Sequence, residues 1–144
     1  MTMTADQIEA FLDEYEQALS DFDADKSASL WGVPGMLLSD DFVGALDSRS
    51  AMAEGLASGY PFYRELGLDR VEHTLLGHED LSERVTRVRV LWHFYSGDEL
   101  LVDGNYEYLI RADDDGPHMY VGVSIDEMDN LRRLAAERGI QVPG

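Results

Sequence analysis

The sequence predicts an α+β domain in which long antiparallel strands pack on an N-terminal helix. Residues 84–95 and 100–111 each alternate apolar with polar or mixed side chains, the pattern of strands with one buried face. Residues 5–22 repeat apolar side chains at the spacing of an amphipathic helix. The chain shows no repeat, linker or low-complexity segment, so residues 1–144 are predicted to form a single domain.

The two alternating runs are predicted to pair as a hairpin whose register follows from their apolar faces. The pairs that share one apolar side are Trp92 with Gly104, Val90 with Tyr106 and Val88 with Tyr108. This register leaves residues 97–99 as a three-residue loop. It also places Arg89 opposite Glu107. His93 likewise falls opposite Asp103, and neither charge pair was used to choose the register.

Capping signals place the elements of the first half. Thr4 and Gln7 form a capping box, so the first helix is predicted to begin at about Ala5. The next predicted elements are a short helix over residues 24–31, two short strands over 36–38 and 42–46, and a helix over 49–57.

The second half is predicted to be mostly strand, followed by a terminal helix. A strand over residues 70–76 is expected to place His73 inward, beside Val90. The last strand is expected to turn four apolar residues inward, namely Met119, Val121, Val123 and Ile125. Ser124 with Glu127 forms a second capping box, which predicts a terminal helix that Gly139 ends.

The acidic composition limits the partners that the chain can have. Against 29 Asp and Glu stand 11 Lys and Arg, with Lys26 as the single lysine, and the formal net charge is −18. This charge argues against nucleic acid and against an anionic membrane surface as partners, and it favours solubility. Acidic, lysine-poor surfaces also suit saline habitats, and one sequence does not separate the two explanations.

The residue types also limit the chemistry. The absence of cysteine excludes disulfides, thiol nucleophiles and thiolate metal sites. The four histidines lack close helical spacing, and the acidic run at residues 113–116 reads as a solvated turn, so neither a metal nor another cofactor is expected. Because no signal peptide and no apolar run near the ~20 residues of a membrane helix is found, a cytoplasmic protein is expected.

The order of these elements resembles the nuclear transport factor 2-like superfamily, which includes ketosteroid isomerases and SnoaL-like polyketide cyclases. The core of the predicted domain spans residues 5–125, and the resemblance covers about residues 8–125 of it. The terminal helix, over residues 126–139, lies outside the resemblance. It implies a cone-shaped, cystatin-like fold in which a curved antiparallel sheet wraps the first helix around a cavity for a small apolar ligand. The terminal helix is expected either to cover that cavity or to pack on a neighbouring molecule.

Ketosteroid isomerases carry, on the first helix, a tyrosine followed by Ala-Leu, which donates a hydrogen bond to the developing oxyanion of the substrate. Tyr15, in the run Tyr-Glu-Gln-Ala-Leu, looks similar. Counting back from the acidic turn, their second oxyanion donor falls on Tyr108. Counting forward, their catalytic aspartate falls on Ser39, which is a departure, and Asp40 lies one residue further on.

The resemblance therefore implies that Tyr15 and Tyr108 are donors. Asp40 is predicted to be the catalytic base, because a carboxylate at the mouth of an apolar cavity can be partly desolvated and have its pKa raised toward the working range. His73 is the alternative base if it lines the cavity, because histidine titrates near neutral pH. The remaining residues expected to line the pocket are Trp31, Trp92, Tyr106, Phe11 and Met52. Aromatic residues on the inward faces of a helix or strand can also be ordinary core residues that only pack against their neighbours.

The expected function is binding of a small apolar ligand, with isomerase, cyclase or hydratase activity by proton transfer on a carbonyl compound. The alternative is a non-catalytic, dimeric ligand carrier or interaction module whose cavity its own side chains fill. The sequence leaves open whether the protein is an enzyme. A homodimer is expected through the outer sheet face, where apolar side chains lie among arginines. The apolar residues of that face are Leu91, Tyr95, Leu109 and Tyr120.

Overall fold

The computed structural model describes residues 2–142, which form five helices and a six-stranded sheet. The helices are α1 (Ala5–Ser20), α2 (Ala24–Ser29), α3 (Arg49–Ala57), α4 (Tyr60–Glu65) and α5 (Glu127–Arg138). The strands are β1 (Trp31–Ser39), β2 (Phe42–Leu46), β3 (Arg70–Asp80), β4 (Val85–Ser96), β5 (Glu99–Asp113) and β6 (Gly116–Ser124). The predicted α+β class is confirmed.

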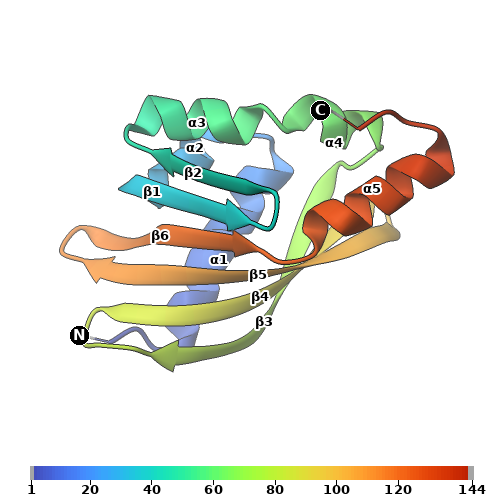
Figure 1. Ribbon diagram of the computed structural model, residues 1–144. Coiled ribbons are helices and arrows are strands. Elements are labelled where there is room, and N and C mark those ends of the chain that lie inside the picture. The colour runs from blue at the N-terminus through green and yellow to red at the C-terminus, as the bar shows by residue number, and fades with distance from the viewer. Residues whose placement is uncertain (1, 143–144) are drawn as a thin grey trace.

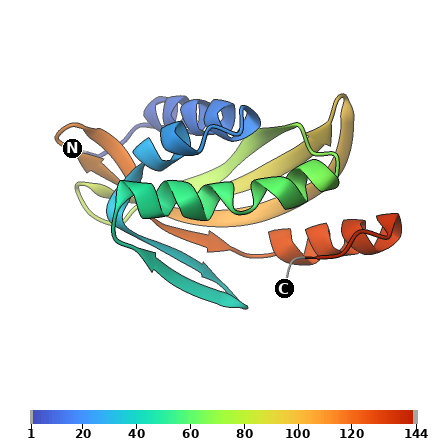
Figure 2. The ribbon, with the colours of Figure 1, turned by 90° about the horizontal axis from the view of Figure 1, so that it is seen from above.

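The sheet has the strand order β2-β1-β6-β5-β4-β3, in which β1 runs parallel to β6 and all other neighbours are antiparallel. The sheet is curved, α1 lies along one of its faces, α3 runs above β1 and β2, and α4 continues from it toward α5 (Figure 1). Seen from above, α3 and α4 lie between α1 and α5 (Figure 2). Of the helices that the structure describes, none is both long and apolar enough to cross a membrane.

Helix α1 begins at the predicted capping box. Thr4 Oγ1 accepts from the Gln7 backbone N–H at 3.2 Å, and the Gln7 side chain accepts from the Thr4 N–H at 2.9 Å. The buried stripe of the helix consists of Ile8, Phe11, Leu12, Tyr15 and Ala18. Because full burial of one large apolar side chain contributes roughly 1.5–3 kcal/mol, this stripe fixes α1 as a wall of the interior.

The β4–β5 hairpin has the predicted register, including the pair of Trp92 with Gly104. The predicted three-residue loop is wrong, because Ser96 pairs with Glu99 and leaves a two-residue turn. Gly97 adopts a φ of 58° in this turn, which glycine does without a steric penalty. A β-bulge just before the turn takes up the extra residue.

The cross-strand charge pairs agree with the prediction only in part. His93 Nδ1 lies 2.7 Å from Asp103 Oδ1, as expected. Glu107 does lie opposite Arg89, but it accepts from Nε of its diagonal neighbour Arg87 at 2.7 Å instead.

Two strand faces differ from the prediction. His73 pairs with Trp92 rather than Val90, because β3 continues to Asp80 through residues that were expected to form the turn. In β6, Met119 is buried as predicted, but the next buried residue is Gly122, while Val121 and Val123 are only half-buried. The β5–β6 register shift between Met119 and Val121 explains the change of face, and Ile125 is exposed.

The predicted capping box of Ser124 with Glu127 is wrong. Ser124 ends β6, and Asp126 is the N-cap residue of α5. The Asp126 carboxylate accepts from the Asn105 backbone N–H at 2.7 Å and from Asn105 Nδ2 at 2.9 Å. These bonds attach the start of α5 to β5 and leave the Glu127 side chain facing inward. Gly139 ends the helix with a φ of 67°, as predicted.

The outer face of β4 carries exposed Arg87 and Arg89 and the half-buried Leu91 and Tyr95. This mixture agrees with the pattern from which a homodimer was expected. The homodimer itself stays a prediction.

Candidate functional site

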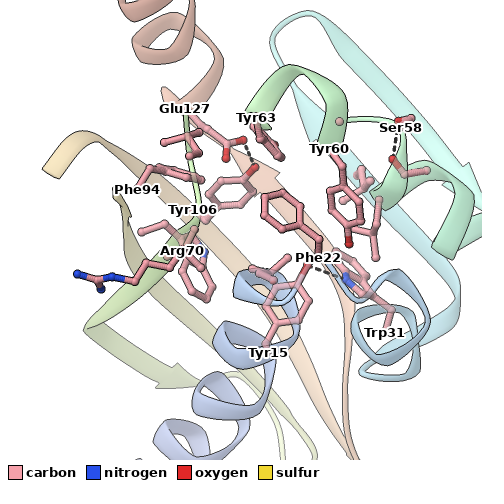
Figure 3. A pocket seen from close by; sticks show the side chains of 18 of the residues that line it. Tyr15, Phe22, Trp31, Ser58, Tyr60, Tyr63, Arg70, Phe94, Tyr106 and Glu127 are labelled. Atoms are coloured by element: carbon pink, nitrogen blue, oxygen red, sulfur yellow. Dashed lines mark hydrogen bonds between the residues drawn. The ribbon is translucent and has the colours of Figure 1, made fainter. Parts of the chain in front are cut away.

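A cavity of about 290 Å³ lies between α1, the inner face of the sheet and the helices α3 to α5. Its wall is mostly aromatic (Figure 3). The aromatic lining residues are Tyr15, Phe22, Trp31, Tyr60, Tyr63, Trp92, Phe94, Tyr106 and Tyr108. The charged lining residues are Arg70 and Glu127. Cavities of this kind hold small, mostly apolar molecules that a few polar groups orient.

Two glycines of the sheet let bulky groups of the cavity wall approach the backbone. A Cβ atom on Gly122 would lie 2.7 Å from the Trp31 ring. A Cβ atom on Gly104 would lie 3.0 Å from Cβ of Glu127. Gly122 therefore makes room for the indole, and Gly104 makes room for the first turn of α5.

Two tyrosine hydroxyls enter the cavity with tryptophans as their hydrogen-bond partners. Trp31 Nε1 donates to the Tyr15 hydroxyl at 3.1 Å, and Trp92 Nε1 donates to the Tyr108 hydroxyl at 2.8 Å. An indole N–H only donates, so each tyrosine oxygen is the acceptor and keeps its own hydrogen for another group. No other hydrogen bond to either hydroxyl occurs within residues 2–142.

The two tyrosines lie close together and remain neutral. Their ring centroids are 6.5 Å apart in an edge-to-face arrangement. Burial raises the pKa of Tyr15, and it raises that of Tyr108 well above the ordinary value for a phenol. Both side chains therefore offer O–H donors across the physiological pH range.

Glu127 is the acidic side chain of the cavity. It is only 7% exposed, and one carboxylate oxygen, Oε2, accepts a short hydrogen bond from the Tyr106 hydroxyl (Figure 3). Burial raises the pKa of Glu127 to about 7; the Tyr106 hydrogen bond opposes this shift and the charge of Asp126 adds to it. In turn, the charge of Glu127, together with burial, raises the pKa of Tyr63 well above its usual value.

No cation neutralises Glu127 among the described residues. Arg70 is the basic residue that lines the cavity, but its guanidinium group turns away from it in Figure 3. There it donates to Glu72 at 2.7 Å and covers the Tyr95 ring at 4.0 Å from the centroid. The cavity therefore holds an uncompensated carboxyl group that takes up or releases a proton near neutral pH.

The structure brings together five of the nine side chains that were expected to form the site. Those that line the cavity are Tyr15, Trp31, Trp92, Tyr106 and Tyr108. The short second helix was expected to include Trp31, but α2 ends at Ser29 and Trp31 begins β1, where its indole N–H reaches the Tyr15 hydroxyl. Phe11 and Met52 were expected to line the pocket as well. They are buried in the core and do not border the cavity.

The expectation that Asp40 lies at the mouth of the cavity is wrong. Asp40 is exposed in the turn between β1 and β2. It borders a separate surface depression together with Arg132 of α5. The tip of the β1–β2 hairpin projects away from the other strands (Figure 2), and no residue of the tip lines the cavity.

His73 faces inward, as predicted, but it contacts α1 instead of the cavity. Its side chain is 5% exposed, and Nδ1 lies 2.8 Å from Glu16 Oε1 while Nε2 lies 3.3 Å from Glu9 Oε1. The Glu16 carboxylate also accepts from the His73 backbone N–H at 2.7 Å. His73 therefore joins α1 to β3.

Sequence reasoning missed Glu127, Tyr60 and Tyr63. A signal for Glu127 was present, because it shares one helical stripe with the buried residues Leu131, Leu134 and Ala135. An acidic residue on a buried stripe indicates a side chain that faces a special environment. The capping-box interpretation placed it on the surface instead.

Two clusters contain side chains of the kinds that bind metal ions. In each cluster, three possible ligand atoms lie within 4.8 Å of one another. The clusters are Asp13 with Glu16 and His73, and Asp113 with Asp115 and His118. Asp113 is not solvated as expected: its carboxylate accepts from His118 Nδ1 at 2.9 Å and from the Tyr120 hydroxyl at 2.7 Å. Glu16 and Asp113 hydrogen-bond to the histidine of their cluster, whereas Asp13 and Asp115 lie 3.9 Å from it.

An aromatic cavity between one long helix and a curved sheet is a feature of a class of small α+β folds. A family model described as "NTF2-like protein (DUF6841)" matches residues 5–126. The chain belongs to this NTF2-like family. The family match ends at Asp126, so α5, including Glu127, lies beyond it.

Solved structures share the fold at low sequence identity. An NTF-2 like protein of unknown function from Shewanella oneidensis is 21% identical, with a TM-score of 0.69 over 86% of this chain and 100% of that one. A ketosteroid isomerase-like protein from Erwinia carotovora atroseptica is 14% identical, with a TM-score of 0.62 over 87% and 97%. The β subunit of benzoate 1,2-dioxygenase from Burkholderia mallei is 19% identical, with a TM-score of 0.61 over 87% and 91%. No curated protein matches the sequence.

Proposed function

We propose that the protein binds a small, mostly apolar carbonyl compound in the aromatic cavity and catalyses a proton transfer on it. One observation carries the proposal: Tyr15 and Tyr108 line the same cavity, and each accepts a hydrogen bond from a tryptophan, which leaves its own O–H donor unused. Two such donors suit a carbonyl oxygen that gains negative charge.

The energetics favour this use of the hydroxyls. Oxyanion-hole donors contribute roughly 3 kcal/mol each to transition-state stabilisation when they are fixed in a water-poor site. Both phenols are fixed here, because the tryptophan N–H groups hold their oxygens and burial keeps them neutral. The similarity in fold to a ketosteroid isomerase-like protein agrees with chemistry of this type.

The non-catalytic alternative has less support. It expects a cavity that the protein's own side chains fill, whereas about 290 Å³ remains open. A ligand carrier with an open cavity would bind the same compounds without changing them.

Binding of planar phenols, which share the planar shape of an enolate and carry an oxygen that accepts hydrogen bonds, tests the proposal. We expect 2-naphthol to bind the parent with a change in fluorescence. We expect Tyr15→Phe and Tyr108→Phe each to weaken binding about tenfold, the equivalent of one hydrogen bond of about 1.4 kcal/mol. Tyr95→Phe on the outer face is the control, and circular dichroism verifies that each variant is folded. Absence of binding by the parent, or equal binding by the double variant Tyr15→Phe/Tyr108→Phe, would contradict the proposal.

A further inference from the structure

We propose that Glu127 is the acid–base residue of the cavity and that the substrate is a ketone with an acidic C–H hydrogen facing α5. This inference rests on the proposed function and deepens it. It assigns the proton transfer to a helix that lies beyond the family match at residues 5–126, in place of Asp40.

The geometry places Glu127 within reach of a molecule that the two tyrosines hold. Tyr106 and Tyr108 are neighbours on the inner face of β5, and their rings stack at 12° with centroids 5.5 Å apart. The Tyr106 hydroxyl donates to Glu127, so the carboxyl group lies one ring further along the same wall. One small molecule can therefore have its carbonyl at Tyr108 and a C–H group at Glu127.

One oxygen of the carboxyl group remains available. Tyr106 donates to Oε2, and within the described residues no group donates to Oε1. Because the side chain is only 7% exposed, it has lost most of its contact with water, and a ligand that donates to Oε1 would replace part of that lost hydration. Glu127 also lines the cavity directly.

The groups that face Glu127 leave its charge uncompensated. They are Tyr106 and Tyr108 from β5, Tyr63 from α4, Tyr15 from α1 and the neighbouring Asp126. None of them is a cation. With its pKa near 7, the carboxyl group exchanges its proton in the range where acid–base catalysis is most efficient.

The proposed step conserves atoms and charge. Glu127 Oε1 takes the proton from the carbon next to the carbonyl, and the C–H electron pair forms the C=C bond of an enolate. The carbonyl π electrons move to oxygen, where the Tyr15 and Tyr108 hydroxyls donate hydrogen bonds. The neutral Glu127 then returns its proton to a carbon of the enolate, which restores the ketone and the carboxylate without any other reactant.

The other candidate bases do not reach this point. Asp40 is exposed outside the cavity, and both imidazole nitrogens of His73 face carboxylates of α1.

Hydrogen exchange of 2-tetralone, an aromatic ketone with acidic C–H groups, tests the inference. Deuterium uptake in D₂O is followed by NMR, and ketone binding is measured separately by titration. We expect the parent to catalyse exchange at a rate that rises with pH through the pKa of Glu127, about 7. Glu127→Gln should lower catalysed exchange at least about 100-fold, while ketone affinity changes less than about threefold. Asp129→Asn, an exposed acid on the same helix, is the matched control.

Tyr106→Phe tests the role of Glu127 through the pH profile of exchange, which would not change if Glu127 had only a structural role. Since the Tyr106 hydrogen bond lowers the pKa of Glu127, its loss should shift the midpoint of the exchange profile to higher pH. Exchange by Glu127→Gln at the parent rate, an unmoved midpoint in Tyr106→Phe, or binding without exchange in the parent would overturn the role of Glu127. Failure of the parent to bind either 2-tetralone or 2-naphthol would instead overturn the proposed function.

Discussion

Glu16 of α1 and Glu127 of α5 are two glutamates that reach inward from helices into opposite electrostatic surroundings. Glu16 accepts from the His73 backbone N–H and lies 2.8 Å from His73 Nδ1, and its side chain is 28% exposed. Glu127 has a single described donor, the Tyr106 hydroxyl, and is 7% exposed. The Glu16 carboxylate therefore has several partners for its charge, whereas the carboxyl group of Glu127 has almost none.

The difference separates structural from chemical roles. A carboxylate with several donors stabilises the contact between two elements, since its charge is used. A carboxyl group that burial keeps partly protonated opposes folding when it ionises, and the protein retains it at a cost in stability. The predictions below test this contrast between Glu16 and Glu127.

The largest effect is expected from Glu127→Gln at alkaline pH. The pKa of Glu127 rises from 4.5 to about 7 on folding, so below pH 4.5 both states of the parent are protonated and folding has no ionisation penalty. As pH rises from 4.5 to 7, the unfolded chain releases the proton while the native state keeps it, so the parent loses stability. The free energy of unfolding of the variant minus that of the parent should therefore be about 3 kcal/mol larger at pH 8 than at pH 4.

Urea unfolding of both proteins from pH 4 to 8 measures this effect, and the difference between them cancels the other titrating groups. Asp129→Asn should track the parent throughout, because Asp129 is exposed. A pH-independent difference between parent and Glu127→Gln would show that folding leaves the pKa of Glu127 unchanged, and would contradict the prediction.

Gly104→Ala should weaken the docking of α5. Its Cβ atom would lie 3.0 Å from Cβ and 3.3 Å from Cα of Glu127, so the first turn of α5 must move. We expect a loss of about 2 kcal/mol in the free energy of unfolding, as for other overpacked sites. Gly55→Ala is the control, because its Cβ atom lies 3.5 Å from Leu46 and alanine favours the helix. Equal stability of Gly104→Ala and the parent would mean that α5 adapts without strain.

Glu16→Gln should destabilise the protein at pH 7 by about 1 kcal/mol, because the amide replaces a charged acceptor of the His73 bonds. Glu14→Gln, exposed on the same helix, removes the same charge without a partner. In a chain of net charge −18, that control should be neutral or slightly stabilising. Changes of opposite sign in the free energy of unfolding of the two variants would support the contrast. Equal changes would show that Glu16 contributes no more to stability than an exposed acidic residue.

Salt should produce the smallest and most general effect. Sodium chloride screens repulsion among exposed carboxylates, so the melting temperature should rise from low to molar salt. The stability difference between parent and Glu127→Gln at pH 8 should persist, since screening acts weakly on buried groups. A melting temperature that does not change with sodium chloride concentration would show that repulsion among the carboxylates does not lower the stability of the fold.

The sequence determined the elements whose signals are local. The capping box at Thr4, the stripe of α1 and the alternation in β4 and β5 predicted a helix and a hairpin that the structure contains with the same central register. Tyr15 and Tyr108 could be placed on inward faces for the same reason, because periodicity decides which side of a helix or strand is buried. The resemblance then supplied the expectation that the two faces meet.

Only the tertiary structure decided what each polar group contacts. Asp40 and Glu127 are both acidic residues near element ends. The stripe of α5 indicates only that Glu127 faces inward, and nothing local shows that it is buried against Gly104 while Asp40 stays outside the cavity. The β-bulges changed which residues of β6 face inward, and the contact of Asp126 with Asn105 set the start of α5. Burial and pKa depend on groups distant in sequence, so the carboxyl group of the cavity became identifiable only once α5 was placed against β5.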